Sequence, residues 1–332
     1  MNRIIKNIKY AICVVLTMAI MSCDNMFTEF YQCDSFITFQ YDYNMQYVDR
    51  FQAEAEGVNL FVFDQDGYFV SQIAYTKSDI QGDRMKLPLE AGMYQILAWA
   101  GYDGTNYAST TTLTPGVTMI RDVFIELVCE ANNTFGKVLP NLWHGLDTLY
   151  EVRNSNDRDT IYLTKDTQKL IFTLENIDGT AVDIRDLNIE ITEANGVYCC
   201  HNHTERNCDI CFVGMPSKLI TYRPYRVDET KTKSDEERVV AEMSFLRLLA
   251  NTGNDLVITF KSTGDTLIHQ SLTTYLDALR LDQYNSMSLQ EYMDREDEYR
   301  FNLAFRILES NKIGMQVTIN GWYVREEQLG EV

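Results

Sequence analysis

Four cysteines and two histidines crowd into thirteen positions of this sequence, and these residue types could do chemistry together. They are Cys199, Cys200, His201, His203, Cys208 and Cys211. Thiolate sulfur and imidazole nitrogen are the ligands of tetrahedral zinc sites. Cys208 and Cys211, separated by two residues, would form one limb of such a site, and two of the other four residues would form the second limb. One hypothesis for this cluster is therefore a bound zinc ion.

Cys23 is a second chemical candidate, because it lies where a lipoprotein signal peptidase would cleave. Three basic residues come within the first nine positions, and a mostly apolar run extends from Tyr10 to Ile20. That run is too short to cross a bilayer, which takes about 20 apolar residues, but it fits the core of a signal peptide. We predict a signal peptide over residues 1–22, palmitate-like acyl chains on Cys23 and a tether over residues 23–32.

Export changes how the cysteines are interpreted, because exported thiols tend to oxidise. Two disulfides within the 199–211 cluster would staple a hairpin tip and leave Cys33 and Cys129 to pair or to remain thiols. Adjacent Cys199 and Cys200 are poorly placed to bond to each other. We favour disulfides over zinc, keep free or mixed thiols as a third alternative, and predict no other cofactor. For the start of the chain, the unusual Met21 leaves an ordinary secretory signal as the alternative.

Motifs for catalysis are missing elsewhere. The sequence has no Gly-x-Ser-x-Gly elbow, no His-Glu-x-x-His and no Gly-rich phosphate loop. His144 and His269 stand alone, and we predict them to be surface or hydrogen-bonded core residues. Glu291 and Asp294 are predicted to lie on a solvated helix face. We therefore predict that the protein is not an enzyme; a metal-dependent enzyme at the cysteine cluster is a remote alternative.

Composition and charge narrow the class of protein further. The chain has 332 residues, 45% of them hydrophobic, which is enough for the cores of two ordinary domains. Its formal charge is −19, and removal of the three positive charges of the signal leaves −22. Such acidity argues against a nucleic acid partner and against peripheral binding to an anionic membrane. The predicted lipid would therefore have to hold the protein at the membrane.

Alternating apolar and polar residues predict the strands that must position any site. In the first half they are 36–43, the hairpin 58–70 with its Asp-Gly turn and a long strand 117–128, together with 94–100, which is apolar on both faces and is therefore predicted to be a central strand. In the second half they are 161–163, 170–174, 187–192, the hairpin 256–268 and a last strand 315–324. The polar run 151–159 is the best candidate linker. We predict an all-β fold, with a β-sandwich domain over residues 33–150 and another over residues 160–332.

One helix is predicted among these strands. Ser288 and Glu291 form a capping box, in which each side chain bonds a free backbone N–H of the first turn. The helix is expected to continue as far as Tyr299. Tyr292 and Tyr299 would then share one face and pack on a sheet.

Several stretches together resemble the FimB-type family of fimbrial anchor lipoproteins from Bacteroidetes, the anchor subunits of type V pili. They are 39–45 (FQYDYNM), 63–67 (FDQDG), 97–101 (LAWAG), 163–167 (LTKDT), 290–299 (QEYMDREDEY) and 319–322 (INGW). They occur in the family's order and cover almost the whole mature chain. The cysteine cluster has no counterpart in the family pattern.

This resemblance implies two tandem transthyretin-like β-sandwich domains, with a lipid anchor in the outer membrane and exposure at the cell surface. It implies a non-enzymatic role at the base of a fimbria, or pilus. Pilin subunits would be the partners, bound by β-strand complementation through an open edge or the C-terminal strand. The alternative is a surface lipoprotein adhesin that binds a glycan or a host protein.

Overall fold

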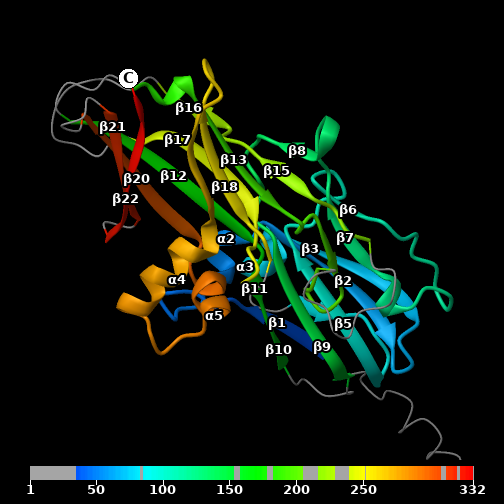
Figure 1. Cartoon of the computed structure of the whole chain (residues 1–332). Coiled ribbons are helices and arrows are strands. Elements are labelled where there is room, and N and C mark those ends of the chain that lie inside the picture. The colour runs from blue at the N-terminus through cyan, green and yellow to red at the C-terminus, as the bar shows by residue number, and fades with distance from the viewer. Residues whose placement is uncertain are drawn as a thin grey trace, which may run out of the picture.

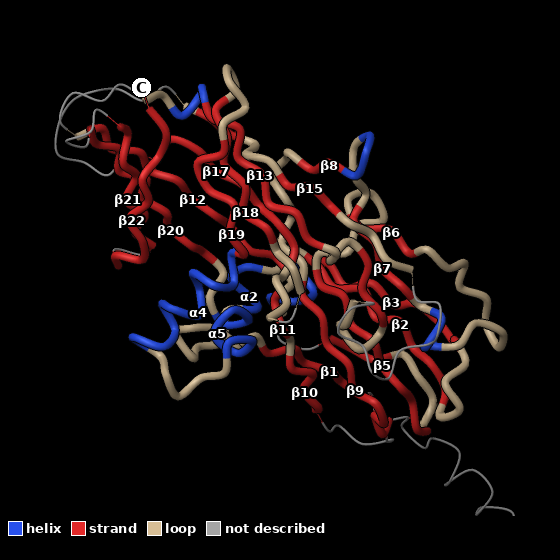
Figure 2. Tube along the Cα trace, in the orientation of Figure 1, coloured by secondary structure: helices blue, strands red, loops and turns tan. Residues whose placement is uncertain are grey.

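Strands make up most of the structure, which is a computed structural model of the chain. It describes residues 35–82, 85–152, 158–177, 182–204, 216–228, 239–250, 252–307, 312–319 and 322–331. The described strands form five sheets, and the α-helices lie together beside them (Figures 1 and 2). None of the described helices is long and apolar enough to span a membrane. The all-β prediction is confirmed.

A five-stranded sheet is the centre of the N-terminal half. Its strands in spatial order are β11 (Thr164–Lys165), β9 (Trp143–Val152), β5 (Gly92–Ala100), β2 (Gly57–Asp64) and β3 (Phe69–Thr76). Strands β2 and β3 are the predicted hairpin. Asp64 Oδ1 closes its turn by accepting the N–H groups of Asp66 and Tyr68, and Gly67 takes the left-handed conformation at φ +85°.

Both faces of this sheet are covered by smaller sheets. One cover consists of β10 (Arg158–Tyr162), β1 (Ser35–Gln40) and β4 (Met85–Leu87), and the other consists of β14 (Val197–Cys199), β7 (Phe124–Leu127) and β6 (Tyr107–Ser109). Ile96 and Ala98 of β5 pack in the core under the first cover, while Leu97 and Trp99 pack in the core under the second. The prediction of a central strand that is apolar on both faces is thus confirmed.

Two larger sheets form a sandwich in the C-terminal half. The six-stranded sheet runs β16 (Arg226–Val227), β17 (Val239–Leu246), β12 (Thr167–Asn176), β20 (Glu298–Ile307), β21 (Lys312–Ile319) and β22 (Trp322–Glu331). The five-stranded sheet runs β19 (Thr266–Ser271), β18 (Asp255–Phe260), β13 (Leu187–Glu193), β15 (Ile220–Tyr222) and β8 (Thr134–Phe135). Alternate residues of β13 are buried, as their pattern predicted.

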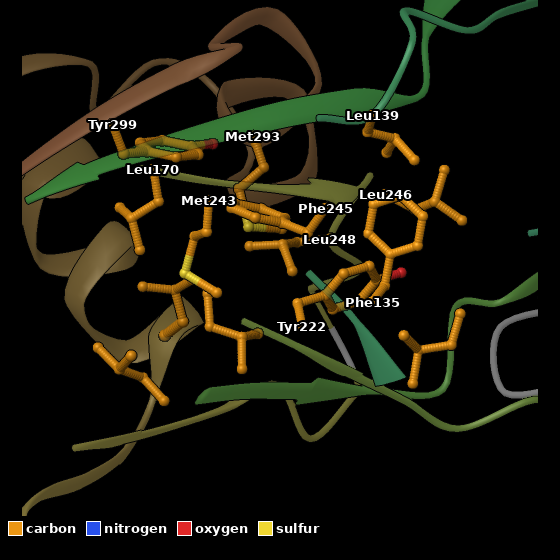
Figure 3. Packing of buried hydrophobic residues seen from close by; sticks show 14 of the residues in the cluster. Phe135, Leu139, Leu170, Tyr222, Met243, Phe245, Leu246, Leu248, Met293 and Tyr299 are labelled. Atoms are coloured by element: carbon orange, nitrogen blue, oxygen red, sulfur yellow. The ribbon is translucent and has the colours of Figure 1, made fainter. Parts of the chain in front are cut away.

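The two halves exchange strands. Strand β8 comes from the first half of the sequence but pairs with β15, and β14 comes from the second half but pairs with β7. Strand β10, which begins inside the predicted linker 151–159, pairs in parallel with β1. Figure 3 shows Phe135 of β8 packed beside Tyr222 and Phe245 of the C-terminal half, with the ring centroids of Phe135 and Tyr222 6.3 Å apart. One core therefore continues across both halves.

Four α-helices are described: α2 (Phe51–Glu54), α3 (Lys77–Gln81), α4 (Leu272–Gln283) and α5 (Leu289–Arg295). Half of the predicted capping box of α5 is confirmed, because Ser288 Oγ accepts the N–H of Glu291 at 3.1 Å, whereas Glu291 Oε1 accepts from Arg295 Nε. The predicted length is wrong: Glu296 is extended, and Tyr299 belongs to β20. Tyr292 and Tyr299 are both buried, but from a helix and a strand. Helix α4 was not predicted.

Two predicted strands differ from the structure. The stretch 117–128 starts in a turn that includes the preceding Gly116, at φ +71°. A 3₁₀ turn follows at Ile120–Asp122, and strand β7 (Phe124–Leu127) begins only after it. Thr118 Oγ1 bonds to the local backbone at Thr112 and Thr114, which favours the turn over a ladder. The predicted last strand is in fact the hairpin β21–β22, and Asn-Gly, the pair in the sequence between them, is a typical signal of such a turn.

Candidate functional site

The described part of the cysteine cluster is a tight turn at the end of β14. The Cys199 N–H donates to the carbonyl of His203, and the Cys199 carbonyl accepts the N–H of Asn202. Asn202 takes the left-handed conformation, with φ +60°. Both cysteines are buried, whereas His201 is exposed. Cys33, Cys208 and Cys211 lie outside the described residues.

Among the described cysteines, Cys199 and Cys200 form no disulfide with each other or with Cys129. A hydrogen bond from the Cys200 thiol lowers the pKa of Cys199 to about 6, and the same bond together with burial raises the pKa of Cys200. The described residues contain no group of three or more metal-ligating side chains. Because both hypotheses need Cys208 and Cys211, zinc and the disulfides within the cluster stay predictions.

The lone histidines do not form a catalytic group. Burial lowers the pKa of His144 to about 3, so its ring is neutral, and its Nε2 lies 2.9 Å from the carbonyl oxygen of Cys200. The hydrogen-bonded core position predicted for His144 is confirmed. His269 is exposed on β19, as an isolated surface residue.

A buried ionic cluster lies where the sheets of the two halves meet, at Asp166 between β11 and β12, and sequence reasoning missed it. The Arg247 guanidinium, with 8% of its side chain exposed, lies 3.6 Å from Asp166 Oδ1 and 3.6 Å from Asp294 Oδ1. Asn202 Nδ2 donates to Asp166 at 2.7 Å, and Gln290 Nε2 donates to Asp294 at 2.6 Å. The prediction that Asp294 faces water is therefore wrong.

Electrostatics in this cluster are set by burial. Desolvation raises the pKa of Asp166 to about 7 against the opposing charge of Arg247, and it also raises the pKa of Asp294. Asp166 Oδ2 and Arg247 Nε are buried without a hydrogen-bond partner among the described residues. The cluster fixes how the turn at Asn202, strand β17 and helix α5 meet, and it presents no group to a substrate.

A second ionic group lies beside it, around Lys165 of β11. Its Nζ lies 3.0 Å from Glu54 Oε2 of α2 and 2.5 Å from Asp297 Oδ2, just before β20. The same ammonium lies 5.5 Å from the centre of the Trp143 ring, a cation–π contact. Lys165 thereby joins three segments that are far apart in the sequence.

A cleft of about 300 Å³ opens next to Lys165. Its walls are mostly polar side chains, among them Asn141, Thr167, Lys169, Tyr225 and Glu298. Tyr225 and Lys169 both bind Glu242, so these two polar groups are held in place. The cleft has the size of the smaller ligand pockets found in proteins.

Sheet edges are the remaining candidate for binding, because an edge strand presents unpaired backbone groups. Among the described strands of at least five residues, β3, β10, β19 and β22 lie at edges. Strand β22 carries Arg325, Glu326 and Glu327, and β10 carries Arg158 and Asp159. The eight residues of β3 include no charged residue and no proline.

Comparison with known proteins defines the class first: this is a structural protein of a fimbrial system. Residues 30–328 match the family model of the fimbrillin-A associated anchor proteins Mfa1 and Mfa2. The chain belongs to this family, which is a fimbrial anchor family and not an enzyme family, associated with the cell envelope. The resemblance to fimbrial anchor proteins is thus confirmed.

Solved structures give the same fold. The chain is similar to a candidate polysaccharide-binding protein of Bacteroides thetaiotaomicron, with 28% identity and a TM-score of 0.73. The match covers 90% of this chain and 99% of that protein. Over 88% and 98%, it is similar to a candidate adhesin of that organism, with 27% identity and a TM-score of 0.72. The fimbrial anchor protein Mfa2 from Porphyromonas gingivalis has 18% identity over 89% and 99%, with a TM-score of 0.64. The search of curated proteins gave no match.

Proposed function

We propose that this chain is a non-enzymatic anchor that attaches a fimbria to the outer membrane. Acyl chains on Cys23 hold one end in the lipid, and the body binds the first pilin subunit by β-strand complementation. The observation that carries the proposal is the match to an anchor family over residues 30–328. The predicted signal and lipidation site precede that match directly.

Anchoring requires a body that resists pulling, and the way the strands pair supports this role. Strand β1 is the first described element after the predicted tether, so tension on Cys23 would enter there. It lies between β10 and β4 and pairs with both. Tension along β1 would load many backbone hydrogen bonds together, and the exchanged strands β8 and β14 would spread it into both halves.

Binding of a subunit is supported by the open edges. A partner segment that adds to an edge strand gains backbone hydrogen bonds over its whole length, and alternate side chains supply specificity. The C-terminal strand β22 and the strand β3 both lie at such edges. An all-β body therefore offers the partner a surface of the right kind.

Replacement of Cys23 tests the anchor directly. We expect Cys23→Ala to release the protein from the outer membrane and to release assembled fimbriae into the medium, because no acyl chain remains. Mass spectrometry of the mature N-terminal peptide would show the loss of lipid. The matched control is Cys13→Ala within the predicted signal, which should leave lipid and fimbriae unchanged. Protein and fimbriae that stay on the membrane after Cys23→Ala would contradict the proposal.

The polar cleft favours a second candidate function, the binding of a glycan by a surface adhesin. Its neutral and charged hydrogen-bonding groups suit a sugar's hydroxyls, and a similar protein is a candidate polysaccharide-binding protein. Binding of soluble glycans to the full chain, weakened by Asn141→Ala, would support this function. A full chain that recovers pilin but no sugar from outer membranes would argue for the anchor alone.

A further inference from the structure

We propose that the open edge of strand β3 is the docking site for one extended segment of a fimbrial subunit. This inference rests on the proposed anchor function and names the surface that performs it. Strand β3 pairs with β2 on one side and has no second strand neighbour among the described residues. Its sequence, FVSQIAYT, lacks the charges and prolines that commonly protect an edge from a further strand.

The direction of each backbone group along β3 follows from its pairing with β2. Gly57 of β2 accepts the N–H of Gly101 and so points towards β5, which makes Gly57 and Thr76 a non-hydrogen-bonded pair. Thr76 therefore points away from β2, and its N–H bonds instead to Asp79 Oδ2 at 2.7 Å. Alternation then turns the backbones of Ala74 and Gln72 outwards as well. Among the described residues, none bonds to the outward N–H and C=O groups of Gln72 and Ala74.

Both ends of this open edge are defined. Towards the hairpin turn, Phe69 donates to Thr118 and accepts from Gly116, so the loop already occupies that end. At the other end, Thr76 begins helix α3 through its capping box with Asp79. The open stretch is therefore Ser71–Tyr75, enough for one short strand. A single extended segment therefore fits this stretch.

Side chains along the stretch indicate what the segment looks like. Ile73 is half-buried against the core under the β10–β1–β4 sheet, and Tyr75 is buried there. On the opposite face, Gln72 and Ala74 are exposed. The incoming segment would continue both rows, with apolar residues beside Ile73 and small or polar residues beside Ala74. It would be uncharged where it enters, because an unpaired charge beside the half-buried Ile73 would lose hydration.

Strand β19, the other long edge strand without Asp, Glu, Lys or Arg among the described strands, provides a matched control. Leu272 donates its N–H to Asn254, so the next pair along, Asp255 and Ser271, is not hydrogen-bonded. Two residues further, His269 opposite Val257 also points its N–H outwards, and its side chain is exposed. Proline at position 269 would therefore remove an outward donor from a different sheet without touching a ladder bond.

The test uses the full-length lipidated protein in detergent and, as the probe, fimbriae sheared from the producing cells. Gln72→Pro and Ala74→Pro each remove one outward N–H and leave the ladder with β2 intact. We expect each to weaken binding of the fimbriae about tenfold, the effect of one lost backbone hydrogen bond with its partner left unsatisfied. Gln72→Ala, which keeps the N–H, and His269→Pro should bind like the unaltered protein.

Hydrogen exchange on the unaltered protein gives a readout that needs no folded variant. Fimbriae should slow exchange of the amides in the 71–76 peptide and leave the β19 peptide unchanged. Proline variants that bind normally, an equal loss with His269→Pro, or no protection of 71–76 would each overturn the β3 assignment while the anchor function stands. An unaltered protein that binds no fimbriae would overturn the anchor function itself.

Discussion

The junction between the halves and the edge strand β3 use charge in opposite ways. At the junction, Arg247, Asp166 and Asp294 are almost completely withdrawn from water, where ionised groups are costly. Strand β3 lies at an edge, where charged side chains cost little and would protect the strand from further pairing, yet it carries no charged residue. Neither region therefore has the arrangement of charges that would best stabilise an isolated folded chain and keep it from self-association.

The two regions serve two different needs of an anchor, a fixed arrangement of its halves and an edge that is open to a partner. A buried ionic cluster contributes little net stability, but it penalises any arrangement in which a charge loses its partner. We infer that the junction cluster fixes the orientation of the turn at Asn202, of β17 and of α5. The unprotected edge of β3 carries a risk of self-association, which is tolerable where a partner strand covers it.

Loss of Arg247 should break the junction most severely. Arg247→Ala leaves Asp166 and Asp294 buried without their counter-charge, and we expect the free energy of unfolding to fall by about 3–5 kcal/mol. Urea denaturation of the full chain measures this change. Arg223→Ala, which removes a half-exposed pair with Glu190, should cost about 0–1 kcal/mol. Equal costs for the two variants would contradict the difference between the buried cluster and an exposed ion pair.

Local patterns in the sequence predicted the strands and the cap but could not reveal the junction. The apolar faces of β5 and the Ser288–Glu291 cap depend on neighbouring residues, so both were predictable. The sequence places Asp294 in water because its partner Arg247, directly after strand β17, is far away in the chain. No short window records such a pair, or the exchange of β8 and β14 between halves.

Two failures had a signal that was available. Helix α4 buries Leu272, Tyr275, Leu276 and Leu279, which repeat at helical spacing. The stretch 117–128 follows Pro115-Gly116, a common turn pair, and this pair argued against a long strand starting there. Binding sites on a sheet edge differ from both, because an edge is defined only once the strand order is known.

The pH dependence of stability should sharpen the junction side of the comparison. The folded pKa of Asp166 is about 7, above the ordinary value near 3.9 of an unfolded chain. The folded state therefore holds this proton more tightly, so its stabilisation is complete below about pH 4 and is lost as the pH rises through 7. Between pH 5 and 8, the unaltered protein should lose about 2–3 kcal/mol relative to Asp166→Asn.

Urea midpoints of both proteins across that pH range give the measurement. The difference between them isolates Asp166, since all other titrating groups are shared. Parallel curves for the two proteins would show that Asp166 stays ionised in the folded state.

Lys165 offers a milder test, because its partners are less buried. Lys165→Met keeps the stem over Trp143 but leaves Glu54 and Asp297, 15% and 35% exposed, without their shared cation. Water reaches both carboxylates in part, so we expect a loss of about 1–2 kcal/mol. Lys169→Met is the matched control, since the Lys169 side chain is 37% exposed, and should cost less. A greater loss with Lys169→Met would show that the Lys165 group does not join the halves.

The smallest effect is expected at the edge itself, in the absence of any partner. If β3 is open, purified full-length protein in detergent should self-associate weakly through it, and Ala74→Lys should reduce this by placing a charge on the edge. Sedimentation velocity over a range of concentrations would measure the change. Thr266→Lys places the same charge on the exposed start of β19 and should leave association unchanged. Equal effects of the two lysines would mean that net charge, and not the edge, controls self-association. An effect of Ala74→Lys alone would show that the uncharged strand β3 is the surface through which the protein self-associates.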